Sequence, residues 1–256
     1  MLYNYTFYFL IYSFLGWSLE VCHAALNTGK FVNRGFLNGP YCPIYGFGSM
    51  AIIYFVTPFK ENLLILFIAS VIITSILELI TGFLLEKIFG YRWWDYSNVP
   101  FNIKGYICLK FSILWGLACI LLLNVIHPLV RRLIFSTPLF LGKLIMYVCV
   151  TSIIVDLIVT IKTVLNLNIK LEKLEKIAQD IHQFSNNIGD KLSTNFLANQ
   201  EKFKAAKKKN WLERRLLKSF PDLRSTRYEK HLKGLMNDLY QDQEENRPSN
   251  VEGEAE

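Results

Sequence analysis

Three carboxylates interrupt long apolar stretches of the sequence: Glu20, Glu78 and Glu86. An ionised side chain is costly inside a bilayer, so such a residue is a candidate functional group by default. Carboxylates on helical faces beside a broken segment are typical of transporter sites, where they handle a proton or a cation. The alternative for Glu78 is a structural ion pair with a neighbouring helix, and Lys110 is the obvious partner.

A second group of reactive side chains lies in an irregular segment, residues 27–45. Pro40 and Pro43 lack a backbone donor and the neighbouring glycines tolerate unusual dihedral angles, so a long regular helix is not expected. Arg34 would bind an anionic group or pair with Asp95. Irregular backbone at membrane depth persists only where protein buries it or where it lines a wet cavity. We therefore predict a re-entrant or cavity-lining loop, and the alternative is an ordinary connector.

The composition places this chemistry in a membrane. The chain is 52% hydrophobic and its mean hydropathy is +0.26, which excludes a disordered chain and indicates a membrane protein. Nearly all long apolar runs fall in residues 1–166, whereas residues 167–256 carry 17 basic and 15 acidic residues. The net charge of +7 is typical of cytoplasmic loops. We predict a transmembrane domain over 1–166 followed by a charged tail.

The elements that must position these groups are helices. We predict an all-α, polytopic membrane bundle of five transmembrane helices, over about residues 3–25, 44–59, 63–89, 106–130 and 139–165. The second is short for a hydrocarbon core of ~30 Å. Polar residues at four-residue spacing, around Glu78 in the third helix and Asp156 in the fifth, are expected to face the bundle interior.

Charge patterning gives an orientation. Five spans put the two termini on opposite sides, and the tail, rich in Lys and Arg, is predicted to be cytoplasmic in a multi-pass protein of the cell membrane. Arg131 and Arg132 then fall on the outer side, against the positive-inside rule.

The tail divides further. Residues 167–237 are predicted to form an amphipathic, basic helical segment suited to a coiled coil or to packing on a partner. Lys202–Lys233 contains 12 basic and 3 acidic residues, which favours an anionic lipid leaflet or a protein partner. Nucleic acid is not expected, since no recognition fold is readable. The acidic residues 238–256 are predicted to be disordered.

An ordered set of motifs over about residues 5–150 gives a specific resemblance. It comprises Phe14-Leu15-Gly16-Trp17-x-x-Glu20, Asn33-Arg34-Gly35-Phe36-Leu37-x-Gly39-Pro40-x-x-Pro43-Ile44-Tyr45-Gly46-x-Gly48, Leu77-Glu78, Thr81-Gly82, Leu85-Glu86, Trp94-Asp95-Tyr96-Ser97, Asn102-x-x-Gly105, Cys108-Leu109, Trp115-Gly116 and His127-Pro128. This set resembles the putative ABC-transporter type IV family of CmpB-like bacterial membrane proteins. The tail stretch from Arg215 to Pro221 also resembles that family's tail.

The resemblance implies a permease and a set of positions for a substrate- or ion-binding cavity. These positions are Glu20, Asn33, Arg34, Asn38, Tyr45, Glu78, Glu86, Trp94, Asp95, Tyr96 and Asn102. The sequence has no P-loop, so an ATPase would be a separate subunit; it also lacks the E-A-A loop pattern with which ABC importers dock one. A homo-oligomer is the other expected assembly.

Three functional hypotheses follow. The first is a membrane transporter or ABC-type permease subunit without its own ATPase. The second is a membrane scaffold or regulator that acts through its tail. The third is a membrane metalloenzyme using Glu20, His23 and Asp95 around a metal, because Glu20 and His23 share a helical face. We expect the first, with no enzyme activity, cofactor or bound metal.

Overall fold

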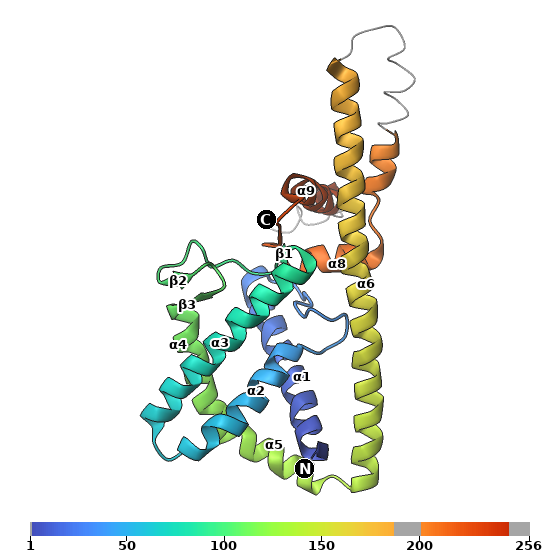
Figure 1. The fold of residues 1–256 in the computed structure, drawn as a ribbon. Coiled ribbons are helices and arrows are strands. Elements are labelled where there is room, and N and C mark those ends of the chain that lie inside the picture. The colour runs from blue at the N-terminus through green and yellow to red at the C-terminus, as the bar shows by residue number, and fades with distance from the viewer. Residues whose placement is uncertain (1, 187–200, 246–256) are drawn as a thin grey trace, which may run out of the picture.

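The structure, a computed structural model, describes residues 2–186 and 201–245, and its architecture is all-α (Figure 1). Within these residues four helical segments are long and apolar enough to cross a membrane: Leu2–Thr28, Leu63–Phe89, Leu109–Ser136 and Leu139–Asp180. A shorter apolar helix, Pro43–Phe59, completes the bundle. The predicted class of a polytopic membrane helix bundle is therefore confirmed.

The short helix α2 (Pro43–Val56) is followed by the single turn η1 (Thr57–Phe59). Together they span about 27 Å, slightly less than a hydrocarbon core of ~30 Å. Pro43 starts the helix, where its missing N–H group costs nothing. α2 packs closely on α1 (Leu2–Thr28), because the ring of Tyr45 fills the space over Gly16 and a Cβ atom at Gly46 would lie 2.8 Å from the Phe9 carbonyl oxygen.

The third span, α3 (Leu63–Phe89), has a cap at each end. The Asn62 side chain accepts hydrogen bonds from the backbone N–H groups of Leu64 and Ile65. Gly90 ends the helix in the left-handed conformation, with φ of +74°. The boundaries match the predicted span of residues 63–89.

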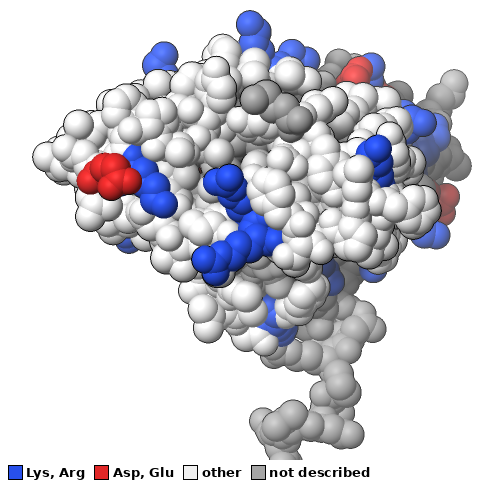
Figure 2. Space-filling view, turned by 90° about the horizontal axis from the view of Figure 1, so that it is seen from below, with Lys and Arg blue, Asp and Glu red and all other residues white. Residues whose placement is uncertain are grey.

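The fourth span is interrupted. α4 (Leu109–Leu121) passes into a π-helical stretch, η2 (Leu122–Ile126), and then into α5 (His127–Ser136). Pro128 lacks a backbone donor, so the wider π turn before it accommodates the proline. α5 runs across the end of the bundle opposite the tail and exposes Arg131 and Arg132 (Figure 1). Figure 2 views this end of the bundle, where most of the surface is uncharged and basic groups stand out together with an acidic group near one edge.

α6 (Leu139–Asn186) leaves the bundle and enters the tail as one helix of 48 residues. It carries the chain to the same end as the segments that join α1 to α2 and α3 to α4 (Figure 1). The second of these segments holds β1 (Tyr91–Arg92) and a hairpin of β2 (Asn102–Ile103) and β3 (Ile107–Cys108), which pairs Asn102 with Cys108. The fourth helix was predicted to begin at residue 106, but Ile107 and Cys108 form β3 of this hairpin and α4 begins at Leu109.

The tail folds back onto the bundle. Residues 201–207 are helical, and α8 (Trp211–Ser219), β4 (Arg224–Ser225) and α9 (Glu229–Glu245) follow. β4 pairs antiparallel with β1, with Tyr91 opposite Ser225. The tail shares a core with α6 and the end of α3, which includes Phe89, Tyr91, Leu167, Leu171, Leu174, Leu216, Leu217, Leu232, Leu235 and Leu239.

The amphipathic segment that starts at residue 167 was predicted to suit a coiled coil or packing on a partner. In the structure Leu167, Leu171 and Leu174 pack on the chain's own α8 and α9. α9 continues to Glu245, eight residues into the segment expected to be disordered, because Leu235 and Leu239 are buried in the shared core. The predictions for residues 187–200 and 246–256 lie outside the described residues.

Two glycines of α2 provide a test of the α1–α2 packing. We expect Gly46→Ala to destabilise the protein by about 1–3 kcal/mol, because the added methyl group meets the Phe9 backbone and cannot be accommodated by a side-chain rotation. Gly48→Ala is the matched control, since its nearest neighbour would be a Leu77 methyl carbon at 4.0 Å. Thermal unfolding in detergent micelles measures both. Equal melting temperatures for the two variants would contradict the close packing.

Candidate functional site

Four of the predicted residues form what we call the acid–tyrosine cluster: Glu20, Tyr45, Glu78 and Tyr96. The Tyr45 hydroxyl donates to Oε1 of Glu20 at 2.5 Å, and the Tyr96 hydroxyl donates to Oε1 of Glu78 at 3.3 Å. The two pairs are neighbours: Glu20 lies near enough to Tyr96 for its charge to contribute to the raised pKa of that tyrosine. α1, α2, α3 and the segment after β1 thus each contribute one member.

The carboxylates of this cluster have no basic partner. Neither Glu20 nor Glu78 forms an ion pair with Lys, Arg or His in the part of the chain that the structure describes. Lys110, the alternative partner for Glu78, instead lies 5.9 Å from the centre of the Phe111 ring. Oε2 of Glu78 is buried without a hydrogen-bond partner among the described residues. The cluster therefore offers carboxylate oxygens that a proton or a cation could take up.

Aromatic rings and tyrosine hydroxyls set the character of the cluster. The Tyr45 ring meets Trp115 edge-on, with the ring centres 5.6 Å apart, and Tyr96 stacks on Phe111 at 4.8 Å. Burial, together with the charge and hydrogen bond of Glu78, raises the pKa of Tyr96 far above its usual value. Tyr96 therefore remains a neutral hydrogen-bond donor at every physiological pH.

Two other predicted acids belong to a chain of ion pairs at the end of α3. Arg92 Nε lies 2.9 Å from Glu86 Oε2, and Arg92 Nη1 lies 3.6 Å from Asp95 Oδ1. Asp95 Oδ2 also pairs with Arg224 Nη1 of the tail at 2.7 Å. Tyr106 donates a further hydrogen bond to Glu86 at 2.9 Å. Glu86 and Asp95 are thus neutralised within the protein, unlike Glu20 and Glu78.

The electrostatics of this chain favour its ionised form. Burial alone would raise the pKa of Asp95, but the hydrogen bonds from Ser97 and the charges of Arg224 and Arg92 outweigh burial and lower that pKa below its usual value. The hydrogen bond to Glu86 raises the pKa of Arg92 further. Asp95 therefore links the α3–α4 segment to the tail through a charged contact.

Trp94 and Asn102 shape the segment between α3 and α4. The Trp94 Nε1 group donates to the Tyr106 carbonyl at 2.8 Å, and its ring packs on Gly82. Asn102 closes the turn by donating to the Val99 carbonyl at 2.8 Å and accepting from the Gly105 N–H at 3.1 Å. These hydrogen bonds hold the backbone that presents Tyr96.

The loop after α1 is anchored on an acid of α6. Asn38 donates to Asp156 Oδ1 from both its backbone N–H, at 3.1 Å, and its side chain, at 2.7 Å. The Gly39 N–H donates to Asp156 Oδ2 at 2.6 Å. Asn33 accepts from Trp17 Nε1 at 2.8 Å and donates to the Asn38 carbonyl at 2.8 Å. The loop is therefore folded on itself and covers the intramembrane Asp156.

Sequence reasoning missed two contributors from the tail. Arg215 donates to Asn38 Oδ1 at 3.0 Å, and the Ser219 hydroxyl donates to the Asn33 carbonyl. Their only sequence signal is the resemblance of the stretch from Arg215 to Pro221 to the family's tail. Arg34, which was predicted to bind an anion or pair with Asp95, is half-buried and forms neither a hydrogen bond nor an ion pair with any described residue.

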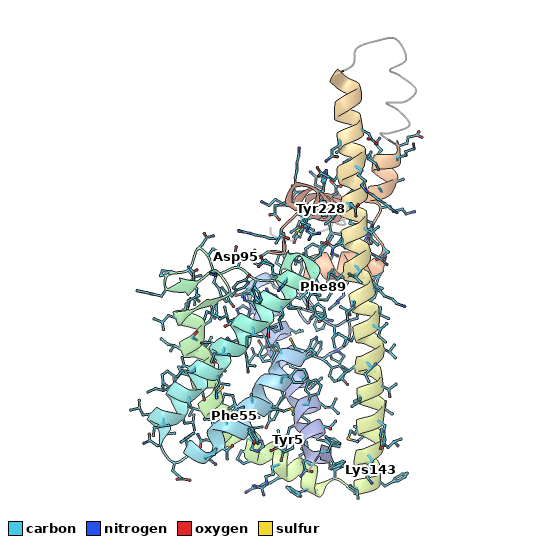
Figure 3. The ribbon with its side chains drawn as sticks, in the orientation of Figure 1. Tyr5, Phe55, Phe89, Asp95, Lys143 and Tyr228 are labelled. Atoms are coloured by element: carbon cyan, nitrogen blue, oxygen red, sulfur yellow. The ribbon has the colours of Figure 1, made fainter. Side chains whose placement is uncertain are left out.

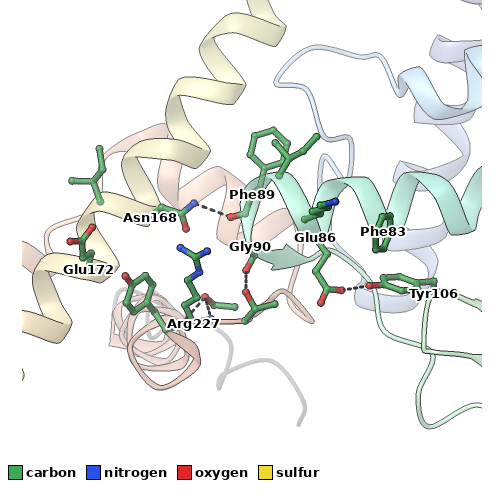
Figure 4. A pocket seen from close by; sticks show the side chains of 14 residues that line it. Phe83, Glu86, Phe89, Gly90, Tyr106, Asn168, Glu172 and Arg227 are labelled. Carbon is green, nitrogen blue, oxygen red and sulfur yellow. Dashed lines mark hydrogen bonds between the residues drawn. The ribbon is translucent and has the colours of Figure 1, made fainter.

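A pocket of about 430 Å³ lies between the end of α3, α6 and the segment from β4 to α9 (Figure 4). Glu86 and Tyr106 line one end, Asn168 and Glu172 line the other, and Arg227 extends between them (Figure 4). No member of the acid–tyrosine cluster lines this pocket. Figure 3 places Asp95 and Phe89 on the tail side of the bundle, far from Lys143 at the opposite end.

The residues named for a metal do not converge. Nowhere in residues 2–186 and 201–245 do three His, Cys, Asp or Glu side chains lie close enough to hold a metal ion. His23 contacts the Asn27 side chain at 3.1 Å instead of a carboxylate. The geometry gives no support to a centre formed by Glu20, His23 and Asp95.

Comparison with known families gives one match. Residues 7–161 match the family model described as Putative ABC-transporter type IV. The matched residues hold nearly all of α1, the chain from α2 to α5 and the first part of α6 with Asp156, but not the folded tail. All eleven predicted positions lie within them. No curated protein and no solved structure matches the chain.

The ion pair between Asp95 and Arg224 makes tail docking depend on pH. The lowered pKa means that Asp95 contributes its full stabilisation at neutral pH and loses it as the pH falls through that lowered value. Because the Arg224 side chain is 54% exposed, we expect Asp95→Asn to cost only about 1 kcal/mol at pH 7 and almost nothing in acid. Thermal unfolding of both proteins from pH 7 to pH 3 measures the difference. Glu172→Gln, in an exposed pair with Lys176, is the control.

A difference between the parent protein and Asp95→Asn that grows as the pH falls would contradict this assignment. So would an equally large effect of the Glu172→Gln control at neutral pH.

Proposed function

The chain belongs to the Putative ABC-transporter type IV family, and from this premise we propose that it is a permease-type transporter subunit without its own ATPase. Membership makes it a transporter-like membrane protein. The observation that carries the proposal is the acid–tyrosine cluster, in which Glu20 and Glu78 face tyrosine hydroxyls and no basic group among the described residues. Substrate identity is not part of the proposal.

The cluster supports a role in binding a proton or a cation. A carboxylate without a counter-charge is unstable inside a bundle, so it gains stability by taking up a proton or a cation. Each tyrosine hydroxyl satisfies one carboxylate oxygen and leaves the other available. Glu20 comes from α1 and Glu78 from α3, so a cation bound between them would link two helices of the bundle.

An ATPase partner, if the subunit uses one, would dock at the end that holds the tail. The basic residues of the tail favour a cytoplasmic location, and the loops that present Tyr96 and Asn38 lie at this end. We also propose contact between the tail and anionic lipid there. Lys87 and Arg227 line the pocket at the end of α3, beside the exposed apolar side chains of Ile88 and Ile169.

A scaffold or regulator acting through the tail is the second candidate, and the docked tail is the observation that favours it. Deletion of residues 170–256 does not separate the two functions, since it would also remove Arg215 and Arg224 from the membrane loops. Point variants in the acid–tyrosine cluster do separate them, because a scaffold would tolerate the loss of these carboxylates.

We expect Glu20→Gln and Glu78→Gln to reduce ion flux by about tenfold or more, because each removes an unpaired carboxylate and keeps the side-chain shape. Liposomes that contain the protein and a pH-sensitive dye, driven by a potassium diffusion potential, measure proton entry. Glu61→Gln, at an exposed position between η1 and α3, is the control and should conduct like the parent.

The ion-flux proposal fails if the parent protein admits no protons in this assay and carries neither Na⁺ nor K⁺ in a matched tracer-flux assay. It fails equally if both glutamine variants behave like the parent.

For the ABC-type assembly, we expect a nucleotide-binding subunit to co-purify with the protein from native membrane in mild detergent. The reason is that a permease without a P-loop needs a separate ATPase to drive transport. Mass spectrometry of the purified complex, with ATP hydrolysis as a second readout, tests this. Recovery of the protein alone under conditions that preserve a known importer complex would contradict the ABC-type assembly and leave an autonomous transporter.

A further inference from the structure

Four oxygens of the loop after α1 converge on one guanidinium group from the tail. Arg215 Nη2 donates to the carbonyls of Gly35, at 2.5 Å, and Leu37. Arg215 Nη1 donates to Asn38 Oδ1 at 3.0 Å and to the Phe36 carbonyl at 3.4 Å. Each terminal nitrogen therefore has two acceptors, which is a geometry suited to a planar fork of donors.

One of the four oxygens, Asn38 Oδ1, is oriented by contacts that do not involve the arginine. Asn38 uses its amide nitrogen to donate to Asp156 and Thr160, so its Oδ1 is turned toward Arg215. Asp156 is also fixed by the Gly39 N–H, and its negative charge acts on Arg215 across the loop. All four acceptors thus belong to the loop, which Asp156 of α6 anchors, and they lie within the residues that match the family model, whereas the guanidinium comes from outside them.

We propose that this loop is a binding site for a small guanidinium-bearing cation, and that Arg215 is its built-in occupant. Carbonyl and amide oxygens around a nearby carboxylate accept hydrogen bonds and favour a cation over an anion. A guanidinium group reaches all four oxygens at once, whereas an ammonium group is a point charge with three donors. While the tail is docked, Arg215 occupies the site, and a free cation would enter only when α8 is released.

One atom of Arg215 suggests the size of a free ligand. Its Nε is buried without a hydrogen-bond partner among the residues that the structure describes, so the site uses only the two terminal nitrogens. Methylguanidinium retains both of these groups. The proposal goes beyond the transporter function and is separate from the acid–tyrosine cluster, and it requires no flux measurement.

Chemical rescue tests the proposal. Arg215→Ala should lower the melting temperature of the full-length protein in detergent by about 3 °C or more. Methylguanidinium chloride at about 20 mM should restore at least half of the loss, since it refills the vacated site. The parent protein and Arg214→Ala are the controls, because Arg214 is the adjacent, exposed arginine of α8. Neither should gain stability from methylguanidinium.

Two further salts identify the cause of any rescue. Methylammonium chloride and NaCl at the same concentration should not restore Arg215→Ala. Equal rescue by either salt would overturn the guanidinium site and leave a general effect of charge, and no rescue by methylguanidinium would overturn it as well.

The design also covers the case in which Arg215→Ala does not fold by itself. Recovery of monodisperse Arg215→Ala only when methylguanidinium is present during purification would support the site. Failure to recover it with methylguanidinium, while Arg215→Lys folds and purifies, would overturn the proposal. Because every readout is stability, failure here leaves the transporter proposal untouched, and absence of flux leaves this one untouched.

Discussion

Hydrocarbon offers no hydrogen-bond partner to an ion or to an unpaired peptide group, and the polar architecture of this protein follows from that constraint. Asp156 of α6 meets the constraint with donors from Asn38 and Gly39. Glu86 meets it with Arg92 and Tyr106. Both acids therefore have structural partners that account for their place in the bundle.

Glu20 and Glu78 meet the same constraint only in part. A tyrosine hydroxyl is a weaker partner for a carboxylate than a guanidinium, because it brings a dipole and no charge. The difference separates acids that stabilise the fold from acids that remain available. In the sequence, Glu20, Glu78, Glu86 and Asp156 all lie in apolar stretches. Only their partners in the structure distinguish the acids that stabilise the fold from those that remain available.

The sequence predicted what depends on apolar length and on local breaks. The span of α3 was correct at both ends, since Asn62 and Gly90 are strong caps, and the short α2 was expected from Pro43 and the glycines around it. The β2–β3 hairpin was not predicted, because strands of two residues depend on tertiary contacts such as those of Asn102.

Contacts between distant segments could not be predicted from the sequence either. Asn38 and Asp156 are separated by 118 residues, and no periodicity connects them. Arg214 and Arg215 are adjacent and chemically identical, yet Arg214 is exposed and Arg215 has four acceptors. Asp156 lay on a predicted polar stripe, so its inward direction could be anticipated although its partner could not.

The shortness of α2 connects these observations. Even together with η1, the apolar helix Pro43–Phe59 spans only about 27 Å, slightly less than a core of ~30 Å, so part of the chain between α1 and α2 is expected to lie at or below the membrane surface. Backbone at that depth exposes carbonyl oxygens that water cannot reach, and the protein must supply donors for them. Asn33 satisfies the Asn38 carbonyl from within the loop, and Arg215 satisfies three others from the tail. The docked tail is therefore a structural partner of the membrane domain, because Arg215 supplies the hydrogen-bond donors for three carbonyl groups of the loop before the short helix.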